Sequence, residues 1–150
     1  MRLTEHQYFM EITKLVARRS TCIRRQVGSI AVIDKRIIAT GYNGAVSGMT
    51  HCTPETCYRH LHNIPSGEKL DHCLAVHAEQ NLLTQAAIHG VSIKDATVYV
   101  TTTPCLTCLK LLAQIGVKDI FCGNGDYPQL DLAKKICLEK GITIHFLDKK

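Results

Sequence analysis

Two short motifs in this 150-residue chain combine residue types that bind metal ions and move protons. His77 and Glu79 lie two residues apart, and Cys105 and Cys108 lie three apart, directly after Pro104. Cysteines at this spacing face the same side of a helix, and a helix N-terminus favours thiolates through its dipole and free N–H groups. Three protein ligands leave the fourth tetrahedral position of zinc open, which is the pattern of a catalytic site.

We therefore predict that His77, Cys105 and Cys108 bind a catalytic zinc ion. Glu79 is not needed as a ligand, and we predict that it carries protons between water and substrate. Either motif alone is less specific, because H-x-E arises by chance and P-C-x-x-C also occurs in structural zinc half-sites and redox pairs. In this order, with a strand between them, the two motifs form the signature of zinc-dependent deaminases.

The sequence around the motifs alternates between helical and strand patterns. Thr4 and Gln7 have the spacing of a capping box, Asp34-Lys35 separates two β-rich runs as a hairpin turn, and Pro104 is expected at the first helical position of its helix. Glycines end several helical patterns. The expected helices are 5–19, 77–89, 104–115 and 128–140, and the expected strands are 26–34, 36–42, 96–101, 119–122 and 142–147.

This order predicts the fold class. Alternating strands and helices in the second half favour parallel strands with right-handed crossovers, while the hairpin adds an antiparallel pair. The result is an α/β fold, a three-layer α/β/α sandwich with a five-stranded mixed sheet. Because the chain has the commonest single-domain length and no linker or repeat, we expect one domain over residues 1–150.

Composition narrows the function classes. The net charge of +5 suits a phosphate-bearing substrate without requiring one. No apolar run approaches the ~20 residues of a membrane span, and the first residues do not form a signal peptide, so we expect a cytoplasmic protein. With no Trp and 5% aromatic residues, the chain lacks the stacking platforms that polynucleotide substrates require.

A third feature is the cysteine- and histidine-rich segment 43–73, which is long for a loop in a compact domain. We expect a short helix near residues 55–62 and a metal ion that organises the rest. The predicted ligands of this second, structural metal are Cys22, Cys52, Cys57 and Cys73. His51, His60 or His72 in place of one thiolate, or four free thiols, are the alternatives. Cys122 and Cys137 lie in apolar patterns and are expected to pack in the core.

Further stretches, spread over nearly the whole chain, accompany the two catalytic motifs: Val27-Gly28-Ser29, Thr40-Gly41-Tyr42-Asn43-Gly44, Gly48, His51-Cys52, Cys73, Gln80-Asn81, Thr97-Val98-Tyr99-Val100-Thr101 and Tyr127. With them the chain resembles the deoxycytidylate (dCMP) deaminases of the cytidine deaminase-like superfamily. The Gly41–Gly44 stretch and the cysteine-rich segment indicate the dCMP branch. Val46 departs from the proline of this family's turn.

The resemblance implies zinc-dependent hydrolysis of dCMP to dUMP, which feeds dTMP synthesis. It implies that Asn43 contacts the sugar and that Tyr127 lies near the substrate, although a plain turn and a packing role are the simpler alternatives. The phosphate needs a cation, for which Arg25 is our first candidate, with Arg24 and Arg59 as others.

The resemblance also implies activation by dCTP, inhibition by dTTP, a structural zinc near the cysteine-rich segment, and a homo-oligomer, with hexamers found in this branch. Deaminases of another cytosine, guanine or adenine substrate share the catalytic motifs and stay as alternatives. A non-enzymatic zinc-binding interaction module is a further alternative, against which Glu79 argues, because a structural site needs no proton carrier.

Overall fold

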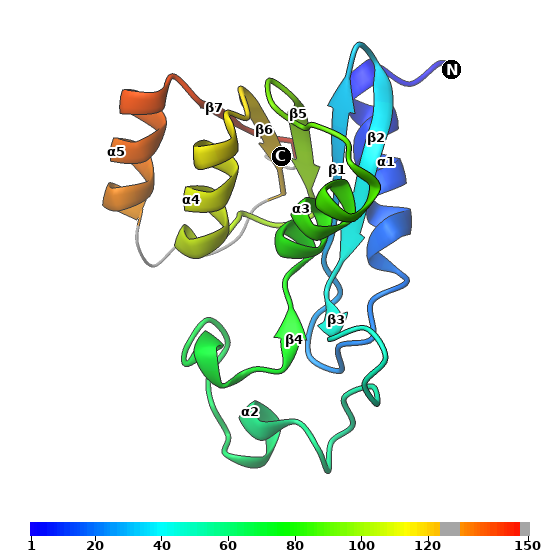
Figure 1. Ribbon diagram of the computed structural model, residues 1–150, viewed down its shortest axis with the longest axis vertical. Helices are drawn as coiled ribbons and strands as arrows, with labels where there is room; N and C mark the ends of the chain where they lie inside the picture. The colour runs from blue at the N-terminus through cyan, green and yellow to red at the C-terminus, as the bar shows by residue number, and fades with distance from the viewer. Residues whose placement is uncertain (124–129, 148–150) are drawn as a thin grey trace.

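A computed structural model of the chain describes residues 1–123 and 130–147 (Figure 1). At its centre lies a five-stranded sheet with the order β2-β1-β5-β6-β7. β1 pairs antiparallel with both β2 and β5, whereas β5, β6 and β7 run parallel. The predicted mixed sheet is thus confirmed. The strands are β1 (Gly28–Ile33), β2 (Arg36–Tyr42), β5 (Thr97–Val100), β6 (Asp119–Cys122) and β7 (Thr143–Phe146).

Helices cover both faces of this sheet, as predicted for a three-layer α/β/α sandwich. On one face α1 (Glu5–Ala17) buries Phe9 and Met10 against Ile30 and Tyr99. On the other face the buried side chains come from three helices and from β1, β2, β5 and β6. These helices are α3 (Ala78–His89), α4 (Leu106–Ile115) and α5 (Leu130–Lys140) (Figure 1). Cys122 and Cys137 belong to this second cluster, which confirms their predicted packing role.

Local sequence signals explain where several elements begin and end. The Thr4 hydroxyl accepts a hydrogen bond from the Gln7 N–H at 3.3 Å, and the Gln7 side chain accepts one from the Thr4 N–H at 2.9 Å, so the capping box forms. Asp34 and Lys35 turn the hairpin with φ of 50° and 61°, as a two-residue turn of the primed type requires. Gly90 ends α3 with φ 65°.

The start of α4 differs from our expectation. Pro104 is not the first helical residue, because Cys105 takes the extended N-cap conformation (φ −68°, ψ 164°) and α4 begins at Leu106. The Cys105 carbonyl already accepts from the Leu109 N–H at 2.9 Å, which is the first bond of the helix. Pro128, expected to open the last helix, lies outside the described residues.

The cysteine-rich segment leaves the sheet between two strands that sequence patterns did not predict. β3 (Gly44–Ala45) and β4 (Ala75–Val76) form a separate two-stranded sheet, and strands this short carry no periodicity. Between them lie the predicted short helix, α2 (Tyr58–Leu61), and the 3-10 turn η1 (Leu70–His72). Figure 1 shows this segment projecting from the end of the sheet below β3 and β4.

Among the residues that the structure describes, none of the helices combines the length and apolar character needed to cross a membrane.

Candidate metal centre and active site

The side chains of His77, Cys105 and Cys108 converge at one point. His77 Nδ1 lies 3.3 Å from Cys108 Sγ and 3.6 Å from Cys105 Sγ, and the three donor atoms all lie within 4.8 Å of one another. In a tetrahedral zinc site, bonds of about 2.1 Å to nitrogen and about 2.3 Å to sulfur place these atoms about 3.6 Å apart. The residues present therefore fit a zinc ion in both donor type and spacing.

Two helix N-termini bring these ligands together. His77 is the N-cap of α3, Cys105 is the N-cap of α4, and Cys108 follows in the first turn of α4. Both N-caps have extended backbone, so each side chain lies at the end of its helix beside the free N–H groups. The side chain of Gln80 accepts a hydrogen bond from the His77 N–H at 2.8 Å and fixes the histidine backbone.

The thiols form an unequal pair. The pKa of Cys105 is lowered to about 4, chiefly because its sulfur accepts a hydrogen bond from the Cys108 thiol, with further contributions from His77 and the local backbone. Donating this hydrogen bond raises the pKa of Cys108. The pKa of His77 is raised, chiefly by its hydrogen bond with Cys105. Binding of a metal ion by both sulfur atoms would require both thiols to lose their protons, so the affinity for the metal would depend on pH.

Glu79 lies in the first turn of α3 with 4% of its surface exposed. Burial raises its pKa, and hydrogen bonding with Cys108 acts in the opposite direction, so its carboxyl group faces the thiols. It is not a member of the tight three-residue group. A buried carboxyl group beside a metal site, but outside its ligands, is placed to exchange protons with a substrate.

Two of the three predicted substrate contacts lie among the described residues. Asn43 is buried: its side-chain oxygen accepts from the Val27 N–H at 2.9 Å and its amide donates to the Arg25 carbonyl at 2.9 Å. Arg25 has an exposed side chain that donates to the Thr102 hydroxyl at 2.9 Å, in the loop that leads to Cys105. Asn43 thus fastens the connection before β1, and its contact with a sugar stays a prediction. Tyr127 lies outside the described residues.

The other two arginines bind the cysteine-rich segment. Arg24 donates to the Ile64 carbonyl at 2.7 Å, and Arg59 donates to the Pro65 carbonyl at 3.1 Å. Arg59 is 8% exposed, and its Nε is the one buried side-chain nitrogen or oxygen without a hydrogen-bond partner among the described residues. The positive charge of Arg59 acts to lower the pKa of His77, so this residue of the cysteine-rich segment interacts electrostatically with the candidate metal centre.

The structure gathers the four remaining cysteines of the predicted structural site. The pKa of Cys52 is raised by burial and then by the thiols of Cys57, Cys22 and Cys73, so these three residues lie near Cys52. Within the described part of the chain they do not form a group as tight as the first triad. Of the alternative histidines, His72 stacks on Tyr58 with ring centroids 5.3 Å apart.

Sequence patterns assigned no structural role to two residues that support this region. Gln80 stands three residues after His77, the spacing of a capping box, so its bond to the His77 backbone was detectable. Ser29 is buried in β1, and its hydroxyl donates to the Ala78 carbonyl at 2.9 Å. No local signal identifies that bond, because the two residues lie 49 positions apart.

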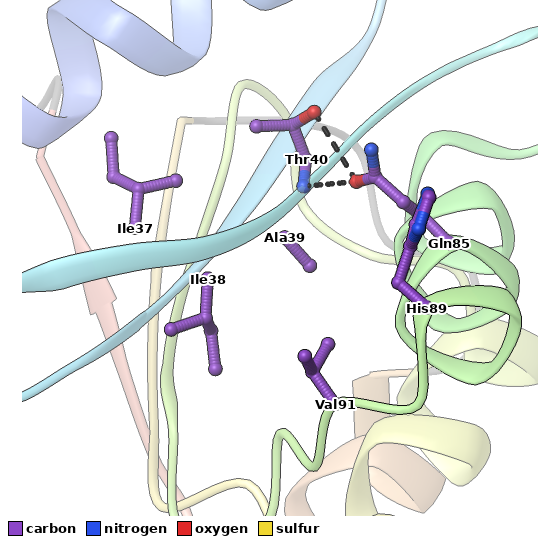
Figure 2. A pocket seen from close by; sticks show the side chains of 7 residues that line it. All are labelled: Ile37, Ile38, Ala39, Thr40, Gln85, His89 and Val91. Carbon is purple, nitrogen blue, oxygen red and sulfur yellow. Dashed lines mark hydrogen bonds between the residues drawn. The ribbon is translucent and has the colours of Figure 1, made fainter.

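A cavity of about 220 Å³ between β2 and α3 contains none of the predicted site residues (Figure 2). Its lining is mainly aliphatic, and Figure 2 shows that the Gln85 side-chain oxygen contacts Thr40 at one end of it. The Thr40 N–H donates to this oxygen at 2.6 Å. The cavity therefore belongs to the packing of α3 on the sheet edge rather than to the candidate metal centre.

The fold is a mixed five-stranded sheet between helical layers. One histidine and two cysteines converge at two helix N-termini, with a buried carboxyl group beside them. This combination defines a zinc-binding domain of the deaminase type. Comparison with known proteins agrees: the cytidine and deoxycytidylate deaminase zinc-binding region matches residues 3–124. The chain belongs to the cytidine and deoxycytidylate deaminase family.

Three similar proteins illustrate this relationship. The chain is 38% identical over 144 residues to ComE operon protein 2 of Bacillus subtilis, covering 95% of this chain and 71% of that protein. It is 43% identical over 113 residues to the deoxycytidylate deaminase of Schizosaccharomyces pombe, covering 75% of this chain but only 35% of that protein. The crystal structure of the dCMP deaminase of cyanophage S-TIM5 in complex with dCMP and dUMP is 30% identical, with a TM-score of 0.76 and coverage of 98% and 99%.

The role of Cys108 as a metal ligand can be tested against a cysteine of equal burial. We expect Cys108→Ala to lose the zinc ion of the triad, because two ligands do not hold the ion tightly. Cys122→Ala is the matched control, since both thiols are 0% exposed and Cys122 lies outside the triad. Zinc per chain, measured by elemental analysis on folded protein, should fall by one only in Cys108→Ala. Equal zinc contents in the two variants would contradict the assignment.

Proposed function

We propose that this chain is a single-domain, zinc-dependent enzyme that hydrolyses dCMP to dUMP and ammonia and so supplies dUMP for dTMP synthesis. The observation that carries the proposal is the triad of His77, Cys105 and Cys108 with the buried carboxyl group of Glu79 beside it. Similarity over 98% of the chain to an enzyme crystallised with dCMP and dUMP supports the choice of substrate.

The hydrolysis exchanges the amino group at C4 of cytosine for oxygen. Zinc bound by the triad supplies Lewis acidity, which makes water acidic enough to attack near neutral pH. The carboxylate of Glu79 would accept a proton from the attacking water and deliver it to N3 of the ring. It would then accept the proton of the new hydroxyl group at C4 and pass it to the departing amine, which leaves as ammonia while C4 becomes a carbonyl carbon. Because Glu79 is almost fully buried, bulk water has little access to the proton that it carries.

For the phosphate of dCMP we propose Arg25. Its guanidinium group is exposed and contacts Thr102, three residues before the ligand Cys105. A planar guanidinium binds phosphate through two parallel hydrogen bonds. Arg24 and Arg59 already donate to backbone carbonyls of the cysteine-rich segment, which favours Arg25 over them. The contacts proposed for Asn43 and Tyr127 stay predictions.

A side-by-side assay of dCMP, deoxycytidine, cytidine and dCTP tests the substrate. We expect the wild-type protein to prefer dCMP, and Arg25→Gln to raise KM for dCMP about tenfold, or about 1.4 kcal/mol, while activity on deoxycytidine stays constant. Arg36→Gln is the control, because Arg36 is an exposed arginine on β2. Failure of the zinc-loaded wild type to deaminate dCMP would overturn the function. An unchanged KM in Arg25→Gln would remove only the role of Arg25.

The proposed role of Glu79 predicts a specific loss. Glu79→Gln keeps the size of the side chain but cannot accept the proton, so kcat should fall by about 10²–10⁴ while zinc per chain is unchanged. Glu139→Gln, at an exposed position of α5, should leave kcat within about twofold of wild type. Near-wild-type turnover of dCMP by Glu79→Gln would exclude Glu79 from the mechanism.

We further propose a second, structural zinc ion held by Cys22, Cys52, Cys57 and Cys73. Cys22, Cys57 and Cys73 lie near Cys52, whose pKa is raised by burial and then by repulsion from the thiolates of these three residues. Four protein ligands form a closed tetrahedral site of the structural kind. Few side chains of this segment are buried, Cys57, Arg59 and Ile64 among them, so apolar packing alone provides little stability.

The second zinc ion is tested with Cys52→Ser. We expect zinc per chain to fall from two to one, the thermal midpoint to fall, and kcat to decrease, because only Leu74 and β4 separate the segment from His77. Cys137→Ser is the control, since Cys137 is a partly buried cysteine outside both metal groups. A single zinc ion in the wild-type protein, together with unchanged stability of Cys52→Ser, would contradict this proposal.

Control by dCTP and dTTP and assembly into a homo-oligomer stay predictions. They are separate from the catalytic proposal, because the triad and Glu79 come from one chain.

A further inference from the structure

The buried hydroxyl group of Ser29 contacts the backbone of the catalytic helix. Ser29 is the only polar side chain in β1 and is 0% exposed. A hydroxyl group in an apolar layer destabilises the fold unless it is hydrogen-bonded. Ser29 Oγ donates to the Ala78 carbonyl at 2.9 Å, and its distance to the Gly41 carbonyl on β2 is longer, 3.5 Å. The bond to Ala78 therefore satisfies this side chain.

The acceptor is the carbonyl of the peptide that joins Ala78 to Glu79. This carbonyl also lies against Gly41, which pairs with Ser29 in the register of β1 and β2. A Cβ atom at Gly41 would clash with the Ala78 oxygen and approach the Leu82 nitrogen to 2.5 Å. The missing side chain of Gly41 thus lets the first turn of α3 contact the sheet, and the Ser29 hydroxyl fixes one peptide of that turn.

We propose that Ser29 is a positioning residue that orients Glu79 through the Ala78–Glu79 peptide. The inference rests on the proposed function, because it assigns to Glu79 the proton transfer described above. His77 has further restraints of its own, namely the two thiols and the Gln80 side chain. Glu79 lies outside the ligand group, so the placement of its carboxyl group depends on its hydrogen bond with Cys108 and on the orientation of the peptide that precedes it.

The remainder of α3 is attached to β2 independently of Ser29. The Asn81 amide donates to the Tyr42 carbonyl at 2.6 Å, and the Gln85 side chain accepts from the Thr40 N–H at 2.6 Å, as Figure 2 shows for Gln85. Loss of the Ser29 hydroxyl therefore leaves the helix packed on the sheet, while the Ala78–Glu79 peptide gains freedom to tilt.

The test is Ser29→Ala with dCMP as substrate. We expect kcat to fall about tenfold or more, because displacements near 1 Å in an active site cost up to about 10²-fold. KM should stay within about twofold, and zinc per chain should be unchanged. In a Glu79→Gln background the same substitution should change kcat by less than about twofold, since the group that Ser29 positions is then inactive.

Two control variants separate positioning from stability. Thr13→Val removes another buried hydroxyl that donates to a helix carbonyl, that of Phe9 at 2.7 Å, but in α1. Gln85→Met loosens α3 without touching its first turn. Both should lower the unfolding midpoint and leave kcat within about twofold of wild type.

Either of two results would overturn the inference: a kcat of Ser29→Ala equal to that of Thr13→Val, or the same fold-loss in the Glu79→Gln background as in the wild type. If Ser29→Ala did not fold, Ser29→Cys would replace it, because a thiol fills the space but donates only weakly. A reduced kcat in Ser29→Cys with zinc retained would support the inference, and an unchanged kcat would overturn it. A wild-type protein inactive on dCMP would instead point to failure of the proposed function.

Discussion

The convergence of two helix N-termini is the constraint on which the rest of this structure depends. His77 and Cys105 are both N-caps, so the backbone must stop being helical at both residues while their side chains approach to 3.6 Å. Like partial charges at the two helix ends repel each other, and a thiolate between them offsets that repulsion. The lowered pKa of Cys105 follows from the same geometry, since the thiolate accepts hydrogen bonds from Cys108 and the backbone.

The sheet order supplies the framework for this convergence. β5 lies in the middle of the sheet between β1 and β6, and a short loop leads from the end of β5 to α4. α3 begins at the same end of the sheet and packs across β1 and β2. There Ser29 donates a hydrogen bond to the first turn of this helix and Gly41 lies against it. The antiparallel β1–β2 hairpin is therefore more than an edge of the sheet, because it sets the position at which α3 begins.

Sequence patterns located the main helices and strands and the two catalytic motifs, because each of those features is local. A capping box at Thr4, a hairpin turn at Asp34-Lys35 and cysteines three residues apart each depend on neighbours within one turn. The hydrogen bond from Ser29 to Ala78 and the close approach of α3 that Gly41 permits are tertiary features, so no residue spacing along the sequence encodes them. The first helical residue of α4 was misassigned for a related reason: proline favours a helix start, but the extended backbone of Cys105 decides where the helix begins.

The cysteine-rich segment is joined to the catalytic centre by very little chain. β3 and β4 pair Gly44 with Val76, so the segment enters and leaves at one place, and His77 follows the last residue of β4 directly. Gly44 packs against Thr21, which precedes Cys22, so the first of the four neighbouring cysteines lies close to the same two-stranded sheet. We therefore expect a change in how the segment is organised to affect His77 through β4, which directly precedes this ligand.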